Sequence, residues 1–77
     1  MRVRVLLFGP LAEAAGRDTV DVEVPDGATV GDVPSLVDGM PESLRSLAYA
    51  VNASYAPTDR PLADGDEVAL IPPVSGG

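Results

Sequence analysis

The residues most suited to carrying out chemistry lie at the end of the chain, where Pro72 and Pro73 are followed by a closing glycine pair, Gly76 and Gly77. Proline has a fixed φ and no backbone N–H, so the two prolines end the preceding run and favour a stiff, extended exit. Glycine has no Cβ, so a partner surface can close around the backbone here and reach the terminal carboxylate. We therefore expect residues 72–77 to form an extended tail whose reactive group is the carboxylate of Gly77.

The side chains that most often carry out catalysis are missing from this chain. It contains no cysteine, no histidine and no lysine, and all five basic residues are arginine. The usual thiolate nucleophile, the usual base near neutral pH and the usual Schiff-base amine are therefore absent. The aspartates and glutamates are scattered through expected turns and strand edges, without the clustered pair that shares acid–base work. We expect no catalysis by this chain alone, no bound cofactor and no metal site.

Size and charge narrow the class of protein further. The chain has 77 residues and a formal net charge of −7, which disfavours nucleic acid and anionic lipid and favours a partner with a basic face. Solubility, or adaptation to a salty cytoplasm, explains the same charge equally well. No apolar stretch is long enough to span a membrane, and Gly9-Pro10 interrupts the N-terminal apolar run before any signal-peptide cleavage site. We expect a cytoplasmic protein with one domain, over residues 1–71.

Alternation of apolar and polar residues predicts most of a sheet. The period-two pattern of strands occurs in residues 2–8, 18–24, 48–52 and 67–71. Residues 54–62 are expected to form a loop or a very short edge strand, because Pro57 and Pro61 interrupt them. For the chain to close compactly, we expect the first and last strands to be neighbours.

One main helix is predicted between the second and third strands. Thr29 and Asp32 have the spacing of a capping pair, and apolar residues recur at helical spacing at Val33, Leu36, Val37 and Met40. Pro34 and Gly39 weaken this helix, so we expect it to be short and irregular at its start. Shorter helical turns are expected at residues 11–15 and 41–47. The order of elements predicts an α+β fold, a mixed sheet of about four to five strands with one main helix packed across it.

Several apolar residues fall on the face of the sheet that the pattern predicts to be exposed. Leu6 and Phe8 lie on the outward side of the first strand, Ala69 and Ile71 on that of the last strand, and Tyr55 on the nearby loop. If the two strands pair, these residues form an apolar patch beside the tail. Because the anchors of protein interfaces are typically aromatic, we expect a docking surface here.

The last sixteen residues carry a resemblance to a known family. Residues 62–77, LADGDEVALIPPVSGG, closely resemble the C-terminal signature of the small, sulfur-carrying subunits of molybdopterin synthase, which are ubiquitin-like β-grasp proteins. The first strand, residues 11–16 and residues 50–52 match as well. Thiazole-pathway sulfur carriers share the fold and the glycine pair but generally lack the Pro-Pro-Val-Ser lead-in, which some archaeal ubiquitin-like modifiers share. The stretch from Pro34 to Pro41 looks shorter and more broken than the helix of the family.

The resemblance implies a mechanism for the tail. An activating enzyme of the ubiquitin-activating type, using ATP and Mg, adenylates Gly77, and a sulfurtransferase system converts it to a thiocarboxylate. The tail then enters the large synthase subunit and gives its sulfur to cyclic pyranopterin monophosphate. The positions that the resemblance assigns to contacts with partners are Phe8, Tyr55, Ile71, Pro72, Pro73, Val74 and Ser75, with Gly76 and Gly77 as the reactive end. The alternatives are a protein modifier conjugated through Gly77, a thiazole-pathway carrier, and an acidic binding module with an inert tail.

Overall fold

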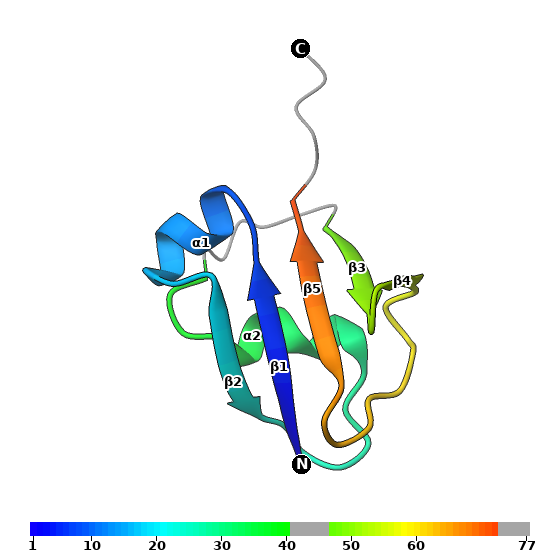
Figure 1. Ribbon diagram of the computed structural model, residues 1–77. Helices are drawn as coiled ribbons and strands as arrows, with labels where there is room; N and C mark the ends of the chain where they lie inside the picture. The colour runs from blue at the N-terminus through cyan, green and yellow to red at the C-terminus, as the bar shows by residue number, and fades with distance from the viewer. Residues whose placement is uncertain (41–46, 73–77) are drawn as a thin grey trace.

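The computed structural model describes residues 1–40 and 47–72 of the chain. Its strands are β1 (Arg2–Leu7), β2 (Thr19–Glu23), β3 (Ala48–Val51), β4 (Ser54–Ala56) and β5 (Glu67–Ile71). Its helices are α1 (Pro10–Ala15), a short 3-10 helix (Val30–Asp32) and α2 (Val33–Leu36), as Figure 1 shows in chain order. The predicted helical turn at 41–47 falls almost entirely outside the described residues.

The five strands form one mixed sheet in the order β2-β1-β5-β3-β4. The first and last strands lie side by side in the middle of the sheet, and they run parallel (Figure 1). The other neighbouring pairs, β1 with β2, β5 with β3 and β3 with β4, are antiparallel. The predicted pairing of the first and last strands is therefore confirmed. This mixed sheet with a helix on one face is the ubiquitin-like β-grasp fold that the sequence predicts.

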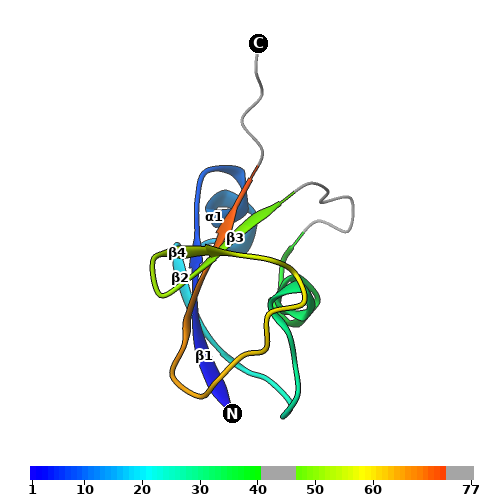
Figure 2. The same ribbon diagram turned by 90° about the vertical axis from the view of Figure 1, so that its right-hand side faces the viewer.

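The core lies between one face of the sheet and α2, as the side view in Figure 2 shows. Every second residue of the central strands points into it, which confirms the predicted alternation. Burying each Val or Leu side chain contributes roughly 1.5–3 kcal/mol. The side chains of the central strands and helices with the least exposure are Val3, Val5, Leu7, Leu11, Val30, Val33, Val68 and Leu70.

The main helix is shorter than its apolar spacing predicts. Its predicted start is confirmed, because Thr29 and Asp32 form a capping box in which the Thr29 N–H donates to Asp32 Oδ2 at 2.9 Å. The helix ends at Leu36, since Val37 is already extended with φ −99° and ψ 123°. Leu36 is 37% exposed, so its predicted place on the buried helix face is wrong. Met40 lies beyond the helix altogether.

The remaining differences concern strand ends. β1 stops at Leu7, so Phe8 follows the strand instead of closing it. Of the two alternatives predicted for residues 54–62, a very short edge strand is found: Tyr55 belongs to β4, where it pairs with Ala50. A two-residue turn joins β3 to β4, and both of its residues, Asn52 and Ala53, have positive φ (51° and 72°). Such a turn matches the twist of a hairpin, although alanine rarely adopts this conformation.

Candidate functional site

β5 and β1 end on the same side of the sheet (Figure 1), because the two strands are parallel and Leu7 is the register partner of Leu70. Phe8 and Pro72 each follow one of these ends directly in the sequence. Pro72 is half-buried. The other predicted tail residues lie outside the described part of the chain, and their roles stay predictions: Pro73, Val74, Ser75, Gly76 and Gly77.

An apolar row crosses the sheet on the face opposite α2. The strand register sets Leu6 beside Ala69, Ala69 beside Ala50, and Ala50 beside Tyr55, so four strands contribute one residue each. Ile71 lies opposite Ala48 one step nearer the end of β5. We call these residues together with Phe8 the apolar face: Leu6, Phe8, Ala48, Ala50, Tyr55, Ala69 and Ile71.

The two aromatic members of the apolar face are its most exposed ones. Tyr55 is 82% exposed and Phe8 is 48% exposed, while Leu6, Ala69 and Ile71 are half-buried. Beside Phe8 is a hollow of about 330 Å³, lined also by Leu6 and by Ala12 of α1. An aromatic side chain next to a hollow of this size is the arrangement that interface anchors use. The structure thus joins Leu6, Ala69 and Tyr55 in one row and places Ile71 on the same face.

The same face becomes charged toward the opposite end of the sheet. Arg2 Nη2 lies 2.8 Å from Glu23 Oε1, and Arg4 Nε lies 3.7 Å from Asp21 Oδ1. Glu67 of β5 is the register partner of Arg4. These ion pairs are exposed and contribute at most about 1 kcal/mol each. The charged half and the apolar half divide one surface, and the apolar half is the one nearest the end of β5.

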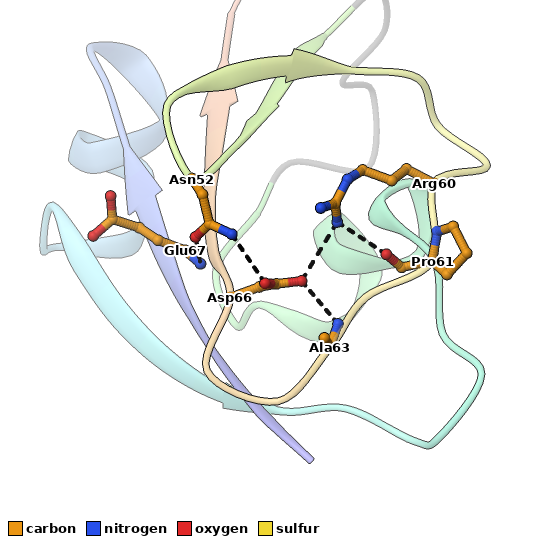
Figure 3. A network of polar contacts seen from close by, with 6 residues as sticks. All are labelled: Asn52, Arg60, Pro61, Ala63, Asp66 and Glu67. Carbon is orange, nitrogen blue, oxygen red and sulfur yellow. Dashed lines mark hydrogen bonds and ion pairs between the residues drawn. The ribbon is translucent and has the colours of Figure 1, made fainter.

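A buried carboxylate fixes the loop that leads into β5. Asp66 is only 8% exposed and accepts hydrogen bonds from the Ala63 N–H at 2.8 Å, Asn52 Nδ2 at 3.1 Å and Arg60 Nη1 at 3.4 Å (Figure 3). Asn52 Oδ1 accepts from the Glu67 N–H at 3.1 Å, which ties the β3–β4 turn to the start of β5.

This network keeps Asp66 ionised. The hydrogen bond from the Ala63 N–H, followed by those from Asn52 and Arg60, lowers the pKa of Asp66 below its ordinary value against the opposing effect of burial. A carboxylate held in this way orders the backbone and is a poor acid–base catalyst. The sequence did not predict this role of Asp66, because residues 64–66 indicate only a turn. The available signal was the spacing of three residues between Asp66 and Ala63, whose N–H the carboxylate accepts.

Two kinds of feature are absent from the described residues. In residues 1–40 and 47–72, no group of three or more Asp, Glu, His or Cys side chains is placed to hold a metal ion. Over the same ranges, none of the helices has the length and apolar character needed to cross a membrane. The candidate site rests instead on the strand register, which gathers the apolar face beside the end of β5.

Comparison with known proteins decides the family. The model of the ThiS family matches residues 5–77, nearly the whole chain. The chain belongs to the ThiS family. Among its curated relatives, the molybdopterin synthase sulfur carrier subunit of Chlamydomonas reinhardtii is 36% identical, with all of both chains covered. Small archaeal modifier protein 1 of Haloferax volcanii is 40% identical, covering 92% of this chain and 95% of the relative.

Solved structures of ThiS-family relatives have the same fold. The crystal structure of SAMP1 from Haloferax volcanii superposes with a TM-score of 0.84 at 34% identity, covering all of both chains. A protein–protein complex of subunits 1 and 2 of the molybdopterin-converting factor from Helicobacter pylori matches with a TM-score of 0.66 at 31% identity, again over all of both chains. This ThiS-family chain is thus similar both to sulfur carriers and to a protein modifier.

Proposed function

We propose that this ThiS-family chain is the sulfur-carrier small subunit of molybdopterin synthase. In this proposal the carboxylate of Gly77 is adenylated by an activating enzyme of the ubiquitin-activating type, which uses ATP and Mg. A sulfurtransferase system then converts the adenylate to a thiocarboxylate. The sulfur is transferred to cyclic pyranopterin monophosphate in the active-site pocket of the large subunit. The chain acts as a carrier and is not catalytic alone.

The observation that carries the proposal is the position of the apolar face. Because β1 and β5 are parallel neighbours, Phe8 and Ile71 lie toward the side of the sheet on which both strands end. Pro72 follows β5 on that side. A partner that covers this face is therefore next to the start of the tail. Immobilising a tail costs roughly 1–2 kcal/mol per residue, and burial of Phe8 and Tyr55 offsets part of that cost.

The large subunit is the proposed occupant of the apolar face. The Helicobacter pylori relative is described as a complex of subunits 1 and 2 of the molybdopterin-converting factor. By that analogy, Phe8, Tyr55 and Ile71 contact the large subunit, and Pro72, Pro73, Val74 and Ser75 guide the tail into its pocket. Gly76 and Gly77 then pass where a side chain would collide.

Intact-mass spectrometry tests the proposal directly. We expect incubation with the activating enzyme, ATP and a sulfur donor to replace one oxygen of Gly77 by sulfur, seen as the matching mass increase. A chain that lacks Gly77 is the control and should show no increase. Gly76→Val should block the reaction without unfolding the domain, because position 76 follows β5, the last strand of the sheet, in the sequence. No mass change under conditions that activate an established carrier would contradict the proposal.

The second candidate function is protein modification. It is favoured by the 40% identity to small archaeal modifier protein 1. In this case Gly77 forms amide bonds with lysines of other proteins, and the absence of lysine from this chain prevents side-chain-linked chains of itself. Conjugates that persist under reducing conditions on a denaturing gel, and that disappear when Gly77 is deleted, would support it.

A further inference from the structure

The edge strand β2 has one side without a strand partner. β2 (Thr19–Glu23) is the first strand in the sheet order and pairs only with β1 in the described part of the chain. It contains no proline, so its backbone is able to pair on both sides. An edge of this kind is a template for another extended chain.

The hydrogen bonds at both ends of β2 identify the free backbone groups. The Leu7 N–H donates to the Asp18 carbonyl at 2.8 Å, and the Val24 N–H donates to the Met1 carbonyl at 2.7 Å. Since hydrogen-bonded pairs alternate along an antiparallel ladder, the even-numbered residues of β2 bond to β1. The N–H and carbonyl groups of Thr19, Asp21 and Glu23 therefore point away from the sheet.

A hollow runs beneath this free edge on the core side. Its volume is about 310 Å³, and its walls include Val20, Val22 and the residues that end α2, Leu36 to Asp38. Leu36 is 37% exposed, unlike the buried Val33 and Val37 on either side of it. A strand added to β2 alternates its side chains between the two faces, so every second one enters this hollow against Leu36 and Val20.

Charge indicates which kind of polypeptide segment would pair with the free edge of β2. Asp21 and Glu23 project on the opposite face, each beside one arginine of β1, and the hollow is lined by one further residue of each charge, Arg17 and Asp38. The chain as a whole carries a net charge of −7. A second copy fits poorly, because pairing β2 with β2 sets Asp21 and Glu23 against like charges. A cationic segment is favoured by the overall charge of −7.

We propose that the free edge of β2 binds an extended, basic segment of a partner protein by β-strand addition. Apolar side chains of the segment enter the hollow against Val20 and Leu36, and lysine or arginine side chains at the alternate positions lie beside Asp21 and Glu23. The site is on the opposite side of β1 from β5, the strand that precedes the tail, so it acts independently of the chemistry proposed for Gly77. The arrangement allows a partner to remain bound while the apolar face and the tail are engaged elsewhere.

The test uses the full chain, labelled with ¹⁵N, and a short peptide of alternating lysine and valine. We expect the amide signals of Thr19, Asp21 and Glu23 to shift and their hydrogen exchange to slow on binding. Peptide N-methylation at the positions that face β2 should weaken binding by at least about tenfold, because it removes the inter-strand donors. Leu36→Asp should weaken binding similarly, and deletion of Gly76 and Gly77 should leave it unchanged.

The remaining outcomes would overturn the proposal. They are no saturable binding, equal binding of the N-methylated peptide, equal binding of a glutamate–valine peptide, and shifts centred on β4 in place of β2. Concentration-dependent shifts of the Thr19 amide without peptide would assign the edge to a second copy of the chain, which also contradicts the proposal. Thr19→Pro removes one edge donor without changing any charge, and in a variant that still folds it should reduce binding.

Discussion

Replacing the buried carboxylate before β5 should weaken the fold substantially. Asp66→Asn keeps the shape of the side chain but removes its charge and sets an amide group against one of three donors, from Asn52, Arg60 and Ala63. Hydrogen bonds to a charged group are worth about 1.5–3 kcal/mol, so losing one and weakening the others should cost roughly 2–3 kcal/mol. A domain of this size has a free energy of unfolding of about 4–12 kcal/mol, so the loss is a large fraction of it.

The loss in free energy of unfolding caused by Asp66→Asn should become smaller as the pH falls. Because the folded-state pKa of Asp66 lies below its ordinary value of 3.8, the ionised carboxylate stabilises the fold above that value. This contribution is lost as the pH falls through the folded-state pKa. Urea unfolding followed by far-ultraviolet circular dichroism at several pH values should therefore show wild type and Asp66→Asn converging at acidic pH.

A matched control separates this effect from a general loss of negative charge. Asp59 is an exposed carboxylate in the same loop region, and Asp59→Asn should change the free energy of unfolding by no more than about 0.5 kcal/mol. The reasoning would be refuted if Asp66→Asn matched that control at neutral pH. A large cost that stayed constant down to strongly acidic pH would refute the electrostatic part of it.

Three further predictions follow from the geometry. Phe8→Asp should weaken binding to the large subunit by roughly 2 kcal/mol or more with an unchanged circular dichroism spectrum; calorimetry measures this, and retained affinity would remove Phe8 from the interface. Ala53→Gly should raise the free energy of unfolding by about 0.5–1 kcal/mol, because φ is 72° there; urea unfolding at neutral pH checks it, and a loss of stability would show that the turn is unstrained. Burial raises the pKa of Tyr49 above its ordinary 10.0, so in Tyr55→Phe the one remaining tyrosine should titrate above that value by ultraviolet absorbance.

Residue alternation was sufficient to predict the sheet. Val3 and Val5 in β1, like Val68 and Leu70 in β5, point into one core, and each strand is polar or only half-buried on its other face. Period-two patterns identify strands well when one face is buried. For the segment of Tyr55 the sequence left a loop and a very short edge strand open, because β4 is only three residues long, too short for alternation to distinguish the two.

The central helix and the buried carboxylate were harder to predict for physical reasons. Leu36 has helical spacing from Val33, but the chain is already extended at Val37, and Gly39 follows with φ 87°. Spacing alone cannot show where tertiary contacts end a helix. The role of Asp66 depends on Asn52, which lies 14 residues earlier in the chain and approaches only when β3 pairs with β5.

The central position of β5 also has a consequence during synthesis. A nascent chain translated through residue 60 contains the β1–β2 and β3–β4 hairpins, but the strand that joins them is still missing. Sheet closure must wait for β5, and contacts between strands so distant in sequence form slowly. Ala69 and Ile71 reach the apolar face only at that moment. A chain that ends before residue 67 therefore lacks both the strand that completes the sheet and two residues of the apolar face.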